Sequence, residues 1–238
     1  MEQKNFTKNL KTCAGTICYK DGSAVRMTDR LASEYYLDVY VNDEFSSQLL
    51  CTPEYLTELT VGHLITAGVI KSYGDIREID VNPAAKQSKV ILNKEVPKRD
   101  IIKQAVTPPV WKPEWLFSMA NDVIHETSLY KITKGTHGCA IGVNGKTLFR
   151  CDDLGRHNAI DKAVGYAAMR QISPESCMLL STGRISTDMV KKVLFSGIPV
   201  FATLKTPTGE AVTMAEQYHL TMLCKVNTEQ FVIYGSGD

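Results

Sequence analysis

The sequence predicts an α/β fold, and three observations lead to that prediction. From about residue 114 onward, segments with helical periodicity alternate with short apolar segments, which is typical of a sheet covered by helices. Asn144-Gly145 stands between two short apolar runs, and this dipeptide predicts a β-hairpin. The chain of 238 residues is 44% hydrophobic and 22% charged, so it can bury a core of ordinary size.

Short strands and one helix are predicted in the first half. Tyr36–Asn42 alternates apolar and polar residues with the period of a half-buried strand. Pro53 occupies a position that suits a first helical turn, and an apolar stripe then predicts a helix that ends near Ile70. Ile76–Val81 and Val90–Asn93 are predicted as further strands.

Prolines cluster between the two halves, within residues 94–113. Because proline lacks a backbone donor and interrupts regular structure, such a cluster predicts a linker. We therefore expect a small α+β domain over residues 1–110 and an α/β domain over residues 111–238.

The second half is predicted as a regular series of elements. A helix over about residues 114–130 precedes the two hairpin strands, 139–143 and 147–151. The remaining elements are helix 157–171, strand 177–181, helix 185–196, strand 198–204, helix 209–218, strand 220–224 and a last strand near 231–234. This order predicts one sheet with helices on both faces.

The composition excludes several classes of function. With 27 Lys and Arg against 26 Asp and Glu, the net charge is +1, which gives no broad attraction to nucleic acid or acidic membranes. We find no apolar run of about 18 residues that would span a bilayer, and no signal-peptide pattern. Seven cysteines, an odd number, favour reduced thiols. We therefore expect a cytoplasmic protein that binds neither nucleic acid nor membranes.

Three strand-to-helix joints share a chemistry that suits phosphate. They are residues 152–162, 181–186 and 206–210, and each combines glycine with hydroxyl or basic residues. Such joints lie at the carboxyl edge of an α/β sheet, and a helix N-terminus offers free N–H groups to phosphate. Arg156 and Arg184 would add bidentate contacts. Ordinary capped turns have the same composition, and neither a Walker A nor a GxGxxG sequence is present.

A fourth cluster, residues 133–139, contains a candidate nucleophile. His137 and Cys139 are two positions apart, so they would share one side of an extended segment. A neighbouring cation lowers the pKa of a thiol and favours a reactive thiolate, whereas the alternative is a buried cysteine that opens a strand. The chain has no CxxC or HExxH sequence, so we expect no metal site. His63 has no evident acidic or thiol partner and is expected to be a packing or surface residue.

Four segments resemble the FdhD/NarQ family, whose members are formate dehydrogenase accessory sulfurtransferases. The segments are TKGTH at 133–137, DDLGRHNAIDK at 152–162, STGRISTDMVK at 181–191 and PTGEAVTMAE at 207–216. The resemblance extends into the first half and covers nearly the whole chain. It implies a cytidine-deaminase-like three-layer α/β/α core in the second half, a smaller α+β first domain and a homodimer.

The resemblance also implies a function in sulfur transfer. A member takes sulfur from a cysteine desulfurase as a persulfide and passes it to the molybdenum bis-guanine-dinucleotide cofactor, which enters formate dehydrogenase or a related molybdoenzyme. GDP is therefore expected to mimic the cofactor. The family's sulfur carrier is a CxxC pair between the domains, and the corresponding stretch here, Gln104–Phe117, has no cysteine.

This departure leaves a second hypothesis, a non-catalytic chaperone that binds the cofactor or a guanine nucleotide and has lost the sulfur relay. A zinc-dependent deaminase is a third hypothesis, and the absence of a PCxxC sequence disfavours it. The catalytic candidates are Cys139 and His137. The cofactor-binding candidates are Thr133, Gly135, His137, Asp153, Gly155, Arg156, His157, Asn158, Asp161, Lys162, Ser181, Gly183, Arg184, Ser186, Pro207, Thr208, Lys225, Val226, Asn227, Thr228, Glu229 and Gln230.

Overall fold

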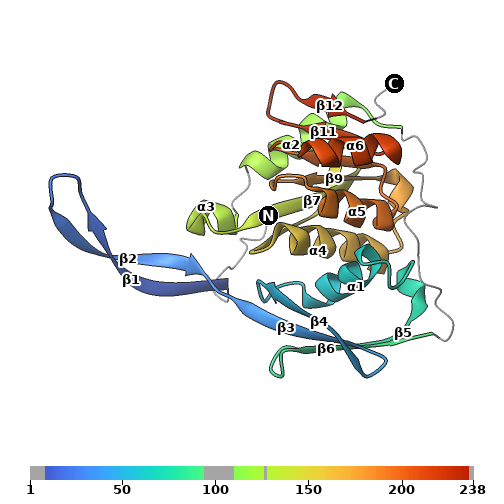
Figure 1. Ribbon diagram of the computed structural model, residues 1–238, viewed down its shortest axis with the longest axis horizontal. Helices are drawn as coiled ribbons and strands as arrows, with labels where there is room; N and C mark the ends of the chain where they lie inside the picture. The colour runs from blue at the N-terminus through green and yellow to red at the C-terminus, as the bar shows by residue number, and fades with distance from the viewer. Residues whose placement is uncertain (1–8, 94–109, 126–127, 236–238) are drawn as a thin grey trace.

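A projecting hairpin and two sheets organise the chain in the computed structural model, which describes residues 9–93, 110–125 and 128–235 (Figure 1). The hairpin pairs β1 (Leu10–Cys18) with β2 (Ala24–Ala32) in antiparallel register. We call residues 10–32 the arm, because they extend away from the rest of the molecule. The sequence analysis did not predict these two strands.

The first half forms a four-stranded sheet with the order β4-β3-β6-β5. Its strands are β3 (Tyr35–Val41), β4 (Glu44–Cys51), β5 (Ile76–Asn82) and β6 (Gln87–Leu92), with a 3-10 turn at Tyr73–Asp75 before β5. Helix α1 (Leu56–Thr66) packs on one face, where Leu56 and Leu59 join Leu37, Val39 and Leu49 in a small core. The predicted helix and three of the strands are confirmed, and β4 was not predicted.

The second half forms a six-stranded mixed sheet with the order β12-β11-β10-β9-β7-β8. Its strands are β7 (His137–Val143), β8 (Lys146–Asp153), β9 (Cys177–Ser181), β10 (Val200–Thr203), β11 (Thr221–Cys224) and β12 (Val232–Tyr234). Strands β9, β10 and β11 are parallel to one another. The hairpin predicted at Asn144-Gly145 is present, and both residues have the positive φ that a tight turn of this kind requires.

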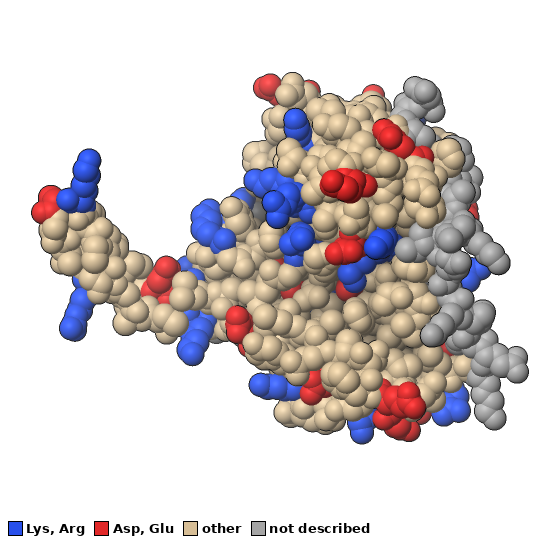
Figure 2. Space-filling model, viewed as in Figure 1, with Lys and Arg blue, Asp and Glu red and all other residues tan. Residues whose placement is uncertain are grey.

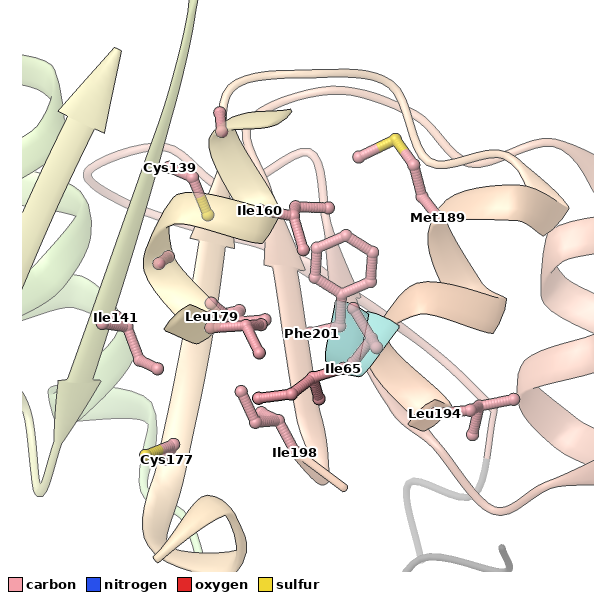
Figure 3. Packing of buried hydrophobic residues seen from close by; sticks show 14 of the residues in the cluster. Ile65, Cys139, Ile141, Ile160, Cys177, Leu179, Met189, Leu194, Ile198 and Phe201 are labelled. Atoms are coloured by element: carbon pink, nitrogen blue, oxygen red, sulfur yellow. The ribbon is translucent and has the colours of Figure 1, made fainter. Parts of the chain in front are cut away.

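Helices cover both faces of this sheet, as predicted. They are α2 (Pro113–His125), α3 (Leu129–Thr133), α4 (Arg156–Met169), α5 (Thr187–Ser196) and α6 (Gly209–Gln217), with a 3-10 turn at Pro174–Ser176. Helix α2 packs on one face, and α4, α5 and α6 pack on the other. Figure 3 shows the second of these layers, where Ile160 of α4 lies next to Phe201 of β10.

The single helix predicted over residues 114–130 is a wrong prediction. Helix α2 ends at His125, and the separate helix α3 begins after Ser128, whose hydroxyl oxygen accepts a hydrogen bond from the backbone N–H of Lys131. A serine at this position caps the start of a new helix. Of the stretch Gln104–Phe117, residues 104–109 lie outside the described part of the chain.

Helix α1 joins the two halves, because it crosses α4 at two glycines. A Cβ atom on Gly62 would overlap the backbone carbonyl of Asp161, and one on Gly165 would overlap the carbonyl of Glu58. The crossing helices therefore touch backbone to backbone, and Leu64 of α1 belongs to the same core as α4. Along the chain, the four-stranded sheet is formed before residue 110 and the six-stranded sheet after it. The domain boundary at residue 110 stays a prediction, because the two halves also share a core.

Candidate functional site

The segments singled out from the sequence meet at one edge of the six-stranded sheet, where the parallel strands end. The N–H of Thr182 donates to the carbonyl of Gly138 at 2.9 Å, which joins the second joint to the 133–139 cluster. The N–H of Leu204 donates to the carbonyl of Ser181, and that of Thr208 donates to Ile185. Three of the segments, residues 133–139, 181–186 and 206–210, are thus tied into one surface by their backbones, and the pairing of His137 in β7 with Asp153 in β8 adds the fourth, residues 152–162.

The C-terminal loop belongs to the same surface. The N–H of Val226 donates to the carbonyl of Thr203 at 3.1 Å, and the N–H of Lys225 donates to Lys205 at 2.8 Å. The Asn227 side chain accepts from the backbone N–H groups of Glu229 and Gln230, which closes a tight turn. These contacts fix the position of residues 225–230 beside the third joint.

A cleft of about 410 Å³ opens at this edge, between helix α3 and the strand ends. Its described lining contains four cationic side chains, Lys131, Lys134, Arg150 and Lys205, against one carboxylate, Asp152, together with the ring of His137. Figure 2 shows Lys and Arg side chains gathered at this edge of the molecule, beside α3 and where the helices that follow the strands begin. The cleft therefore suits an anionic ligand.

One side chain in the cleft lacks a hydrogen-bond partner among the described residues. The hydroxyl of Thr136 is buried, with only 3% of the residue exposed, and it has no hydrogen-bond partner among the described residues. A buried hydroxyl without a partner costs stability, and native proteins rarely leave one. The position is consistent with a ligand that supplies the missing contact.

The pKa of His137 is lowered, chiefly because burial disfavours the charged ring. The nearby cations Arg156 and Lys205 lower it further, and Asp153 opposes them. The pKa of His157 is lowered by burial and then by Arg156 and Lys192. Both rings are therefore neutral at neutral pH, and His137 adds a hydrogen-bonding group to the cationic cleft without adding charge.

Several of the residues predicted to bind the cofactor make contacts within the strand-to-helix joints themselves. A Cβ atom on Gly183 would lie 2.8 Å from the Cβ atom of Arg156, so the glycine allows Arg156 to lie across the second joint. Ser181 accepts from the N–H of Gly183, and the Thr208 hydroxyl oxygen accepts from the N–H of Ala211 to cap α6. Pro207 pairs with Ile185 in an isolated bridge. The remaining candidates here are Thr133, which accepts from the N–H of Gly135, the exposed Arg184, the exposed Thr228 and Ser186, the N-cap residue of α5.

Asp153 and Lys162 form a fully buried ion pair, with 2.6 Å between Nζ and Oδ2. Lys162 also donates to the Thr52 hydroxyl at 2.8 Å, and the N–H of Thr52 donates to Asp153 at 3.1 Å. Asn158 donates to Asp153 at 3.0 Å and to the carbonyl of Leu50 at 2.7 Å. These residues, which are predicted to bind the cofactor, connect the first half to the second in the structure, and the N–H of Gly155 also donates to Asp153.

A second buried cluster surrounds Asp161, another predicted ligand. Its carboxylate accepts from the Thr66 hydroxyl at 2.6 Å and from Lys192 at 2.8 Å. Burial raises the pKa of Asp161, but Lys192 and His63 outweigh it and hold the pKa below its usual value. His63 was expected to lack an acidic partner. It lies 3.5 Å from Asp161 through Nδ1, and its Nε2 is 3.1 Å from the Ser47 hydroxyl.

The expectation of a lowered pKa at Cys139 is corrected by the structure. The side chain is fully buried, it faces the core between the sheet and α4 (Figure 3), and burial raises the pKa of its thiol well above the usual value. Strand β7 lies between β8 and β9, and Cys139 packs with Ala159, Ile160 and Ala163 of α4 in the same core. The ring of His137 therefore does not activate this thiol as the sequence spacing indicated.

The seven cysteines all lie in the described part of the chain, and they divide by burial. Burial raises the pKa of Cys51 to about 12, of Cys177 to about 11 and of Cys224 to about 12. Cys139 and Cys151 are also buried. On the arm, Cys18 is exposed and Cys13 is half-buried, so these two thiols are the ones that a partner molecule can reach.

Sequence reasoning located the segments of the cleft more accurately than its side chains. Among the described lining residues, His137 is the one that the sequence analysis named. It missed Thr136, Thr182, Lys134 and Lys205, although each stands within or next to a segment that it singled out. The density of lysines around the joints was the available signal for two of them.

The described residues contain no group of three or more His, Cys, Asp or Glu side chains that could hold a metal ion. Their helices include none that is long and apolar enough to cross a membrane.

Comparisons with known proteins give one consistent result. The chain matches the sequence profile of the FdhD/NarQ family over residues 32–108 and 95–238. It is 27% identical to the sulfur carrier protein FdhD of Bacillus licheniformis, over 95% of this chain and 96% of that protein, and 27% identical to that of Bacillus subtilis, over 91% and 92%.

The crystal structure of a Desulfotalea psychrophila protein superposes on this chain with a TM-score of 0.86. That protein is described as a formate dehydrogenase accessory protein. The two chains are 25% identical, and the match covers 96% of this chain and 98% of the other.

Proposed function

We propose a function for this chain from the fact that it belongs to the FdhD/NarQ family. In this proposal the chain is a formate dehydrogenase accessory protein, and it carries sulfur to the molybdenum bis-guanine-dinucleotide cofactor. The curated relatives are named sulfur carrier proteins, which supports the family role. The proposed sulfur donor is a cysteine desulfurase in the cytoplasm, and the proposed recipient of the finished cofactor is formate dehydrogenase or a related molybdoenzyme.

The observation that carries the proposal is the cationic cleft with its unpartnered hydroxyl. The cofactor is cargo in this reaction, and its phosphate groups carry the charge that Lys131, Lys134 and Lys205 would balance. The Thr136 hydroxyl and the neutral His137 ring offer hydrogen bonds beside them. The six-stranded sheet with helices on both faces is also compatible with the cytidine-deaminase-like architecture that we propose for this half.

The sulfur-carrying thiol in this proposal is Cys18. The Cys18 thiolate attacks the terminal sulfur of the donor's persulfide, a new S–S bond forms at Cys18, the donor's S–S bond breaks, and the donor leaves as a thiolate. Exposure decides the choice, because a partner protein must reach the attacking thiol. The raised pKa of the buried Cys139 thiol disfavours the same step there.

Replacing Cys18 with serine is expected to abolish sulfur uptake. The protein would be incubated with a cysteine desulfurase and cysteine, and intact-mass spectrometry would measure the addition of one sulfur atom. The matched control, Cys139→Ser, removes a buried thiol and should still gain sulfur. Cys13→Ser tests the other thiol of the arm. Sulfur that remains on the protein after Cys18→Ser and is mapped to Cys139 would show that our choice of thiol is wrong.

The alternative function is a chaperone that binds the cofactor without carrying sulfur. Five buried cysteines and the absence of a CxxC pair favour it. The mass measurement separates the two functions, because the chaperone would gain no sulfur on any cysteine. Both functions require the cleft to bind a guanine nucleotide.

GDP is expected to bind at the cleft, and Lys134→Ala or Lys205→Ala is expected to weaken binding about tenfold to a hundredfold. A hydrogen bond to a charged group contributes about 1.5–3 kcal/mol, and each 1.4 kcal/mol is a factor of ten. Isothermal titration calorimetry would measure the dissociation constants. Lys191→Ala removes an exposed lysine outside the described cleft lining and should bind as the wild type does. Absence of binding at millimolar GDP would contradict both functions.

A further inference from the structure

We propose that Ser47, His63 and Asp161 form a second reaction site, at which the Ser47 hydroxyl attacks small carboxylic esters and hydrolyses them. None of the three residues lines the described part of the cationic cleft. They come instead from strand β4, helix α1 and helix α4, where the two halves of the chain meet. The site uses neither a cysteine nor the cleft, so it does not depend on sulfur transfer.

The three side chains lie in the order nucleophile, base and acid. The Ser47 hydroxyl oxygen is 3.1 Å from Nε2 of His63, which is hydrogen-bond distance between a nucleophile and its base. On the other side of the ring, Nδ1 is 3.5 Å from Oδ2 of Asp161. A proton on Nδ1 leaves Nε2 free to accept the proton of the hydroxyl, and the carboxylate stabilises the imidazolium that then forms.

Asp161 is the group that can complete the bonding of the His63 ring. The Nδ1 atom is buried and makes no hydrogen bond among the described residues, and the Asp161 carboxylate lies beside it. Catalytic hydrogen bonds are often long before a substrate binds, and they tighten during the reaction. The contact between Nδ1 and Oδ2 is therefore expected to shorten when His63 takes up the proton of Ser47.

The position of the Asp161 carboxylate is fixed by two other donors. The Thr66 hydroxyl donates to it at 2.6 Å and Lys192 donates to it at 2.8 Å. Lys192 balances part of the charge, so Asp161 stabilises the His63 imidazolium less than an unshared carboxylate would. Asp161 is thus a positioning residue that acts through the ring, and the groups that touch the reacting atoms are Ser47 and His63.

The backbone of β4 places Ser47 at an accessible position. Among the described strands, β4 is at the edge of its sheet. Ser47 pairs with Val39 and Phe45 pairs with Tyr40, so Ser46 is an extra residue that forms a β-bulge beside Ser47. Bulges redirect side chains and are common next to active sites. Ser47 is half-buried and the His63 side chain is 18% exposed, so both lie near the surface.

The reaction needs only an ester and water. The Ser47 oxygen attacks the carbonyl carbon while its proton moves to Nε2 of His63, and the bond to the leaving alcohol then breaks as the alcohol takes that proton. Water next gives a proton to Nε2 and attacks the acyl group on Ser47, which leaves as a carboxylic acid while Ser47 regains its proton. General-base assistance contributes about 10²–10⁴-fold, so the expected substrates are activated esters with good leaving groups.

Hydrolysis of p-nitrophenyl acetate by the full chain tests this proposal, measured by the absorbance of the released p-nitrophenolate over many turnovers. Ser47→Ala and His63→Ala are each expected to lower kcat/KM about a hundredfold or more, because each removes the general-base pair. The matched control is Ser46→Ala, which removes the exposed neighbouring hydroxyl and should react as the wild type does. Circular dichroism checks that each variant is folded.

Two further measurements separate a reaction site from a structural hydrogen bond. Diisopropyl fluorophosphate should form an O–P bond at Ser47 with loss of fluoride, and peptide mass spectrometry should map the label to Ser47 in the wild type and in Ser46→Ala. Asp161→Asn should lower kcat with little change in KM, since it removes the charge that stabilises the imidazolium.

Three results would each overturn the proposal. They are a wild type that hydrolyses the ester no faster than buffer, a folded Ser47→Ala that keeps the wild-type rate, and a phosphoryl label that is absent from Ser47.

Discussion

Replacing Gly165 with alanine is expected to destabilise the protein by about 3 kcal/mol or more, at the upper end of the cost of overpacking. The new Cβ atom would overlap the carbonyl of Glu58, which is a backbone atom that no side-chain rotation can move away. Helix α1 would have to move away from α4, which would open the core that Leu64 and Ile65 share with Ile160. A loss of this size is a large fraction of the total stability of a typical domain, about 5–15 kcal/mol.

Urea unfolding measured by circular dichroism would quantify this loss. Gly209→Ala is the matched control, because a Cβ atom there meets nothing within 4 Å and the residue lies in the first turn of α6. That variant should unfold at the same urea concentration as the wild type or a slightly higher one. If Gly165→Ala unfolds together with Gly209→Ala, the helices are not in backbone contact.

Replacing Lys162 with methionine is expected to cost about 3–5 kcal/mol, because it leaves the buried carboxylate of Asp153 without its cation. Methionine is similar in length to lysine, so the main loss is electrostatic. Asp153 retains its bonds from Thr52, Gly155 and Asn158, which hold it in place without neutralising its charge. Urea unfolding measures the difference in free energy.

The double variant Asp153→Asn with Lys162→Met tests the cause of that loss. Asparagine removes the charge and keeps one acceptor oxygen, which can serve Gly155 and Asn158 or else Thr52, so the double variant should recover part of the stability. Lys191→Met, at an exposed lysine whose ion pair with Asp188 spans 3.9 Å, should change stability by less than about 0.5 kcal/mol. A double variant less stable than Lys162→Met would show that the unpaired charge is not the cause.

The predicted elements of the second half were largely confirmed because their periodicity reflects burial. Strand β9 is apolar at every position where it crosses the core, apart from its final Ser181, and its predicted bounds 177–181 were confirmed. The arm escaped prediction for the opposite reason. Its strand β1 includes Thr12, Ala14, Gly15 and Thr16, is exposed at most of its positions and lacks the strong alternation that identifies a half-buried strand.

The candidate site was predicted by segment and less well by side chain. Strand ends and helix starts meet at one edge of any sheet of this type, so the grouping of the joints followed from element order alone. The direction of each side chain depends on partners far along the chain, and Lys162 donates to a residue 110 positions away. Pattern reasoning on the segment 152–162 could not distinguish a lysine that binds phosphate from one that neutralises Asp153.

The distance along the chain between Thr52 and Lys162 also affects how the protein folds while the ribosome synthesises it. Synthesis adds about 5–20 residues per second, so the 110 residues that separate this pair take roughly 5–20 s to appear. For most of that interval the residues of α1 exist without α4, and the apolar side chains Leu64 and Ile65 lack the core that later encloses them. We therefore expect the first half of the nascent chain to be the part that molecular chaperones protect.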